Sequence, residues 1–250
     1  IIEKALTTRL VKVKPPPPKV QYSDWEEQLL VKKFDRESGQ IWLKENSLNY
    51  STIIRNHPML KEVFAFDVFA LCAKVVQPPP WLIHAGLEDK FEVHILDEYD
   101  ERQTDYFLQR LSYGLKGAMD KTRGGIQDAA MDNKFHPARE HLDGLVWDKV
   151  PRLDTWLIDF MAARKDDPDY VGAVGRAWMI AAVKRLYEPG CKVDNMLVLD
   201  GDQGAGKSEC FKILSTFGWG GEKKSYFTDD FNLRDCTNKD ELMKLTGAVI

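Results

Sequence analysis

The sequence has few cysteines, no long apolar run and no excess of positive charge. Its four cysteines are scattered without a Cys-x-x-Cys pair, which excludes a disulfide framework and indicates reduced thiols in a cytoplasmic protein. No apolar stretch approaches the ~20 residues that cross a bilayer, and the first residues lack a signal-peptide pattern. The formal net charge of -4 excludes a broadly basic surface that would coat nucleic acid, although a local basic channel stays compatible with it.

The chain has enough apolar residues for a sizeable core. It is 44% hydrophobic over 250 residues, a length that suits one large domain or two small ones. Residues 15–18 are consecutive prolines, which favour extended polyproline II, so residues 1–20 are predicted to be a linker. Because the chain starts at Ile1 and stops in an apolar run at Ile250, we expect an internal piece of a longer protein.

Residues 21–132 are predicted to form a mainly helical α+β region. A capped helix is expected to start at Asp24, and residues 64–71 partly alternate as a strand would. From Asp97 the pattern is helical, with an acidic first turn that complements a helix dipole. A further helix is expected over residues 122–130, with Thr122 as its cap.

The C-terminal half has clearer periodicity. A helix is expected over residues 153–161 behind Asp154 as N-cap, and a longer one over residues 169–187. Residues 195–200 are short, apolar and bounded by turn residues, which is typical of a buried parallel strand. A glycine loop follows directly, and residues 207–217 are predicted to form the next helix.

The glycine loop, residues 201–208, completes the pattern Gly-x-x-x-x-Gly-Lys-Ser. Glycines let the backbone turn its N–H groups inward, and the following helix adds its positive end, so this loop should bind phosphate. Lys207 should reach the β- and γ-phosphates of ATP, and the Ser208 hydroxyl should hold Mg²⁺. Glu209, just after the loop, is expected to be solvated rather than catalytic. The residues predicted to form the nucleotide site are Gly201, Asp202, Gln203, Gly204, Ala205, Gly206, Lys207, Ser208 and Glu209.

Hydrolysis of ATP also needs a carboxylate at the end of a neighbouring strand. Asp229 and Asp230 follow a stretch that is brief and polar for a central strand. Residues 245–250 make a better strand, whose acidic residue would lie beyond Ile250. We therefore predict that this chain binds the nucleotide and hydrolyses little of it.

Several blocks in the second half keep the order and spacing of one family. They include Asn-Lys-Phe-His-Pro-Ala-Arg at 133–139, Leu-Asp-Gly-Leu-Val-Trp-Asp at 142–148 and Pro-Arg-Leu-Asp-Thr-Trp-Leu at 151–157. Further blocks at 174–183 and 187–194 lead into 196–208. Together these residues resemble the virulence-associated E family, replication-type ATPases of phages, plasmids and integrated mobile elements.

The resemblance implies an α/β fold with a P-loop NTPase core over residues 133–250, incomplete at its C-terminal end near the Mg²⁺-binding strand. It also implies a homo-oligomeric ring with ATP at subunit interfaces, action on single-stranded DNA, and often an upstream primase. Interface arginine, sensor and pore-loop residues cannot be assigned in this chain, so helicase activity is inherited by analogy.

Other residues are weaker candidates for metal binding or for contact with DNA. The five histidines show no metal-ligand spacing, and structural hydrogen bonding is expected for His136 and His141. Trp147 and Trp219 are candidates for stacking on bases, whereas core packing is favoured for Trp156 and Trp178. The pair Lys223 and Lys224 is the best candidate for a DNA contact, against a solvated surface as the ordinary role.

Two rival functions stay open at this point. The chain could be a regulatory module in which ATP works as a switch, with no helicase activity, that interferes with a host or a competing element. A small-molecule kinase fits least, because such enzymes place the phosphate loop near the N-terminus.

Overall fold

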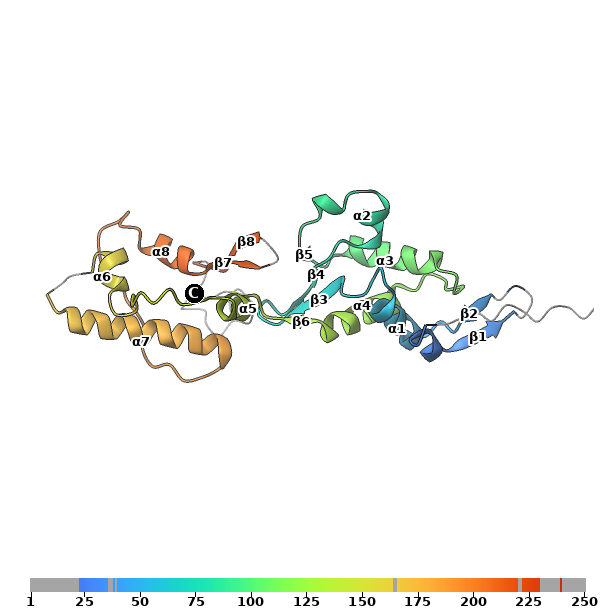
Figure 1. The fold of residues 1–250 in the computed structure, drawn as a ribbon, viewed down its shortest axis with the longest axis horizontal. Helices are drawn as coiled ribbons and strands as arrows, with labels where there is room; N and C mark the ends of the chain where they lie inside the picture. The colour runs from blue at the N-terminus through green and yellow to red at the C-terminus, as the bar shows by residue number, and fades with distance from the viewer. Residues whose placement is uncertain are drawn as a thin grey trace, which may run out of the picture. The chain divides into compact units, whose positions relative to one another are not determined.

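The computed structural model of the chain describes residues 23–35, 38, 40–163, 166–219, 222–229 and 239. They form a mixed α/β structure of helices and small sheets (Figure 1). It divides into two compact units, one of Ile1–Lys61, Pro79–Gly86 and Asp97–Ala129, the other of Glu62–Pro78, Leu87–Leu96 and Ala130–Ile250. The predicted linker, residues 1–20, lies outside the described residues. Within the described part, no helix has the length and apolarity needed to span a membrane.

Helices build most of the first unit. α1 (Ser47–Asn56) starts at Asn46, whose side chain accepts from the backbone N–H of Asn49. α3 (Glu98–Arg110) starts at Asp97 in a capping box, which confirms the helix predicted there. α4 (Met119–Asp132) follows. The short α2 (Pro80–His84) also belongs to this unit.

Thr122 does not cap a helix as predicted, because α4 begins three residues earlier and encloses it. Its hydroxyl donates to Asp105 Oδ1 of α3 at 2.7 Å, and the backbone N–H of Ala118 donates to the same oxygen at 3.0 Å. The buried carboxylate of Asp105 thus satisfies the start of α4 from a neighbouring helix, a role that local sequence cannot reveal.

The helix predicted from Asp24 is wrong. Only the 3₁₀ turn η1 (Glu26–Gln28) forms there, followed by the hairpin of β1 (Val31–Phe34) and β2 (Ile41–Leu43). Glu26 accepts from Ser23 and from the Tyr113 hydroxyl, so its side chain fixes the turn. The β-branched and aromatic residues that follow favour strand over helix.

A four-stranded sheet in order β5-β4-β3-β6 belongs to the second unit. Its strands are β3 (Phe64–Asp67), β4 (Cys72–Val75), β5 (His94–Ile95) and β6 (Lys134–Phe135); the 3₁₀ turn η2 (Glu88–Lys90) lies just before β5. The strand predicted within residues 64–71 is confirmed, but it ends at Asp67. There Asp67 accepts from the N–H groups of Phe69 and Ala70 at 2.9 Å and pairs with Lys74 at 2.6 Å, both side chains buried.

The remainder of the second unit contains the glycine loop. Its elements are α5 (Pro137–Asp143), α6 (Trp156–Met161), α7 (Pro168–Tyr187), α8 (Lys207–Leu214) and the hairpin of β7 (Thr216–Trp219) with β8 (Glu222–Ser225). α7 confirms the long predicted helix. α6 is confirmed in part, since Thr155 takes the N-cap position expected for Asp154. Asp154 accepts instead from Arg176 of α7.

Two further expectations fail near the glycine loop. Among the residues that the structure describes, 191–200 belong to no strand, and Met196 and Val198 are 81% and 70% exposed. A strand needs a hydrogen-bonded neighbour, and the described residues supply none here. The helix expected to reach residue 217 ends at Leu214, because the hydroxyls of Ser215 and Thr216 donate to carbonyls of its last turn.

The adjacent glycines of α4 offer a matched test of the first unit's packing. We expect Gly125→Ala to lower the free energy of unfolding by about 1–3 kcal/mol, because the added methyl group would lie 2.8 Å from Ile54 Cδ1. The control Gly124→Ala meets no atom within 4 Å and should stabilise the helix by about 0.5–1 kcal/mol. Urea denaturation followed by circular dichroism measures both; equal effects would contradict this packing.

Candidate functional site

The glycine loop has the backbone geometry that its sequence predicts. Gly201, Gly204 and Gly206 have φ angles of 156°, 83° and 78°. A Cβ atom at Gly204 or Gly206 would meet nothing within 4 Å, so space does not require glycine at these positions. Their positive φ angles do favour glycine, because a residue with a Cβ atom is strained in this backbone conformation.

The ammonium group of Lys207 lies within this loop. Its Nζ donates to the carbonyl oxygens of Gly201 at 2.8 Å and Asp202 at 2.7 Å. Lys207 is also the first residue of α8, where the leading N–H groups have no acceptor inside the helix. A positive charge and free amides therefore meet at one helix start, which is an arrangement that binds anions.

The other predicted loop residues face solvent. Asp202, Gln203, Ala205, Ser208 and Glu209 are all exposed, with Ser208 and Glu209 on the first turn of α8. The Ser208 hydroxyl is thus accessible to a cation that accompanies a bound phosphate. The described residues contain no cluster of histidine, cysteine and carboxylate side chains that could hold a metal ion by itself.

Aromatic contacts hold α8 in place. The rings of Trp156 (α6) and Trp178 (α7) lie 5.7 Å apart, and those of Trp178 and Phe211 (α8) lie 5.4 Å apart. Gly175 lets α6 and α7 approach, because a Cβ atom there would lie 2.7 Å from Trp156 Nε1. Trp156 is buried, which confirms the core role expected for it, whereas Trp178 is only half-buried and packs between Trp156 and Phe211.

Arg139 is a positioning residue that the sequence analysis missed. Its Nε donates to the carbonyl of Leu186 at 2.6 Å, and its guanidinium lies 5.7 Å from the ring centre of Tyr187. It thereby holds the C-terminal end of α7, from which the chain turns towards the glycine loop. Arg139 occurs in one of the family-like blocks, but nothing in its spacing indicates this contact.

His136 has the structural hydrogen-bonding role that was expected, whereas the contact described for His141 is a ring contact. His136 caps α5, accepting from the Arg139 N–H at 3.3 Å, and its ring stacks on Phe69 at 5.1 Å. Burial lowers the pKa of His136, and the positive charge of Arg139 lowers it further. The ring of His141 stacks on Phe217 at 5.4 Å.

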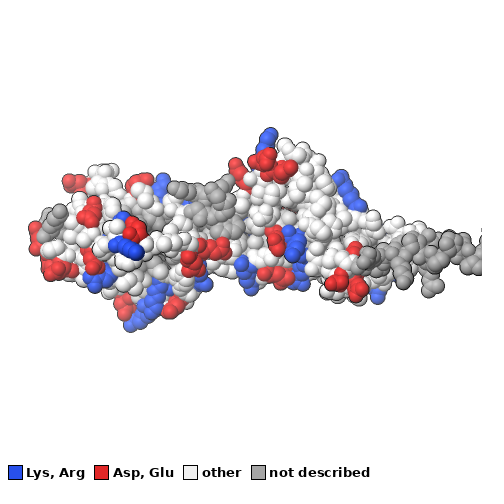
Figure 2. Space-filling view, viewed as in Figure 1, with Lys and Arg blue, Asp and Glu red and all other residues white. Residues whose placement is uncertain are grey.

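The predicted DNA-contact lysines lie on β8. Lys224 is exposed, with its Nζ 5.8 Å from the ring centre of Tyr226, and no described contact joins it to the glycine loop. The side chain of Lys223 lies outside the described residues. Positive and negative side chains are interspersed on the face in Figure 2, which offers no broad basic surface. DNA contact by these lysines stays a prediction.

Of the acidic residues considered for Mg²⁺ binding, the structure describes Asp229. Asp229 is exposed and follows β8 outside any strand. Asp230 and residues 245–250 lie outside the described residues, so the identity of a catalytic carboxylate stays a prediction.

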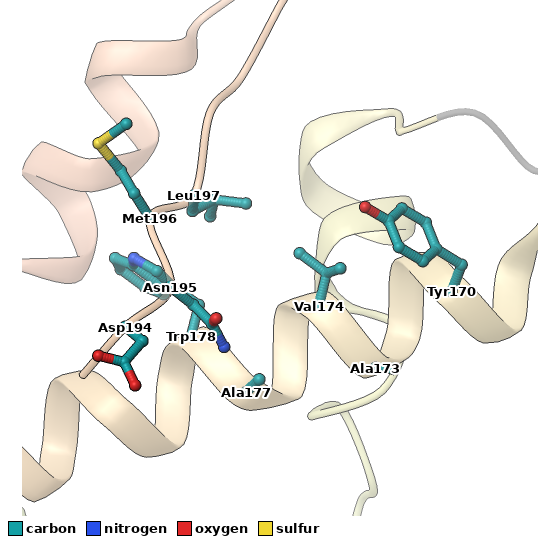
Figure 3. Close-up of a pocket in the computed structure, with 9 residues that line it drawn as sticks. All are labelled: Tyr170, Ala173, Val174, Ala177, Trp178, Asp194, Asn195, Met196 and Leu197. Carbon is teal, nitrogen blue, oxygen red and sulfur yellow. The ribbon is translucent and has the colours of Figure 1, made fainter. Parts of the chain in front are cut away.

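A cavity of about 510 Å³ lies beside the segment that leads to the loop. Figure 3 shows it between α7, which contributes Tyr170, Val174 and Trp178, and residues 194–197. None of residues 201–208 lines it. The glycine loop is therefore an open surface site, separate from this hollow.

Residues 142–250, which include the loop, match the family model for the virulence-associated protein E-like domain. This match confirms, for the residues that it covers, the resemblance based on the sequence blocks. A comparison with curated proteins found no match.

The aromatic contacts predict a specific sensitivity of α8. We expect Phe211→Ala to lower the free energy of unfolding by about 2–3 kcal/mol, because the ring that contacts Trp178 is lost. Ile213→Ala is the control on the same helix; its side chain is largely exposed and its loss should cost at most about 0.5 kcal/mol. Urea denaturation followed by tryptophan fluorescence compares the two, and equal losses would refute the anchoring role.

Proposed function

We propose that residues 201–208 bind ATP with Mg²⁺ in a P-loop NTPase core that belongs to a DNA-replication ATPase of a phage or other mobile element. The observation that carries this proposal is the Lys207 ammonium, hydrogen-bonded to two carbonyls of a glycine loop at the start of α8. The family match of residues 142–250 includes this loop and supports the link to mobile elements.

Each part of the loop has a role in this proposal. Lys207 exchanges its two carbonyl partners for the β- and γ-phosphates, where its hydrogen bonds become charge-assisted on both sides and so stronger. The amides at the start of α8 bond to the phosphate oxygens. The Ser208 hydroxyl holds Mg²⁺, which neutralises phosphate charge. These groups together stabilise the negative charge that develops when water attacks the γ-phosphate.

The apolar segment before the loop also fits such a core. Met196 and Val198 are exposed although both are strongly apolar, and the backbone of residues 195–200 leads directly into the loop. We propose that this segment pairs as a strand of the core, with a neighbouring strand that brings the Mg²⁺-binding carboxylate. The protein then acts on single-stranded DNA as a homo-oligomer, with a neighbouring subunit's arginine completing each site.

Nucleotide binding provides the first test. Lys207→Ala should weaken binding of Mg·ATP by about 10- to 100-fold, because it removes charged hydrogen bonds to phosphate. Lys212→Ala is the matched control, since Lys212 lies exposed on the same helix and outside the loop. Isothermal titration calorimetry measures both affinities. Equal affinities for wild type and Lys207→Ala would reject the loop as the site.

A measurement of ATP turnover distinguishes the proposed ATPase from a regulatory module in which ATP works as a switch. In any protein that contains this chain together with the Mg²⁺-binding carboxylate, we expect ATP hydrolysis to rise with single-stranded DNA and to vanish in Lys207→Ala. Phosphate release with and without DNA gives the result. Turnover that ignores DNA, or binding without turnover, would instead support the regulatory module.

A further inference from the structure

The cavity beside residues 194–197 has two different walls. One wall is a single face of α7, with the rings of Tyr170 and Trp178 about two turns apart and aliphatic side chains between them. The other wall brings the carboxylate of Asp194 and the amide of Asn195 to one end of the cavity, beside Trp178 (Figure 3). Its volume of about 510 Å³ suits a small molecule, and an apolar face with a few polar groups is typical of such sites.

The charge of this lining indicates which kind of ligand fits. Among the described residues that line the cavity, none is lysine, arginine or histidine, and the charged side chain is that of Asp194. Its carboxylate pairs with Lys192 at 3.1 Å, which leaves little net charge at this end. A phosphate group in the cavity would find no cation directed at it and would lie near a carboxylate. The cavity therefore fits a neutral ring, and any phosphates of the same ligand have to bind elsewhere.

The glycine loop lies a short distance from this cavity along the chain. Leu197 lines the cavity and Gly201 begins the loop, so at most about 14 Å separates their Cα atoms. Trp178 also connects the two places, because it lines the cavity and its ring lies 5.4 Å from Phe211 of α8, the helix that begins at Lys207. A single extended ligand with a ring at one end and phosphates at the other can therefore occupy both.

We propose that this cavity holds the adenine ring of the ATP whose phosphates bind residues 201–208, and that Asp194 and Asn195 select adenine over guanine. The inference rests on the proposed function, because the loop has to hold the phosphates for the base to be placed here. Trp178 offers an aromatic ring on which the base stacks. Pairing of residues 195–200 as a strand would use backbone groups, and it would leave the side chains that face α7 in place.

The two polar side chains favour adenine for a chemical reason. Adenine presents an amino donor beside a ring-nitrogen acceptor, and the amide of an asparagine such as Asn195 pairs with both. An ionised carboxylate only accepts hydrogen bonds, so Asp194 suits the amino group of adenine and repels the carbonyl oxygen that guanine has in its place. An adenine of single-stranded DNA offers the same groups, but its backbone phosphates need cations that the lining of this cavity does not provide.

Calorimetric titrations of the chain with Mg·ATP, Mg·GTP and Mg·tripolyphosphate test the proposal. We expect wild type to bind ATP at least about tenfold more tightly than GTP. Asn195→Ala removes hydrogen bonds to the base and Ala177→Leu fills the cavity, so each should weaken ATP at least about fivefold and leave tripolyphosphate unchanged. Ile180→Ala is the control, because Ile180 is 53% exposed on α7 and does not line the cavity.

The three ligands distinguish failure of the base site from failure of the phosphate loop. Tripolyphosphate that does not bind, or that binds Lys207→Ala equally well, would reject the proposed function and the base site with it. If tripolyphosphate binding depends on Lys207 but wild type binds ATP and GTP equally, the base site alone is overturned, and this comparison needs no variant of the cavity to fold. Weaker binding of oligo-deoxyadenylate to Asn195→Ala, with unchanged affinity for ATP, would assign the cavity to DNA and also overturn the proposal.

Discussion

The contact of Phe211 with Trp178 is the constraint on which the candidate site depends. α8 is short, and an isolated helix of this length is unstable in water. All residues of its loop except the half-buried Lys207 are exposed, so burial of the loop itself does little to fix its position. The rings of Trp156, Trp178 and Phe211 instead join α6, α7 and α8, and the absence of a side chain at Gly175 allows the close approach. The N-terminal end of α8, where the glycine loop joins it, is thereby presented from a packed scaffold.

Hydrogen bonds of charged side chains add to the aromatic packing around α8 and α7. Without phosphate, the ammonium of Lys207 is held by two carbonyls of its own loop, so the charge stays close to the free amides of α8. Under the proposed function, the two groups act on the same phosphate once these carbonyls are released. Arg139 contributes from a distance by holding the end of α7 through the Leu186 carbonyl. The family match covers residues 142–250 and so includes this loop.

Features with local causes could be predicted from the sequence. The capping box at Asp97, the long helix α7 and the positive φ angles of the loop glycines each depend on neighbouring residues alone. Features that depend on residues distant in the sequence could not be predicted. Residues 195–200 have the composition of a strand, yet a strand exists only where another strand pairs with it. Thr122 has the chemistry of a cap, but Asp105 from another helix determines its role.

Hydrogen exchange of the chain with and without Mg·ATP tests the central claim most directly, because it reports where the nucleotide binds. The amides of residues 203–209 should exchange more slowly when Mg·ATP is added, since phosphate oxygens accept from N–H groups at the start of α8. The same protection should be absent in Lys207→Ala. Protection confined to α7 and residues 194–197, around the separate cavity, with unchanged exchange in the loop, would contradict the account.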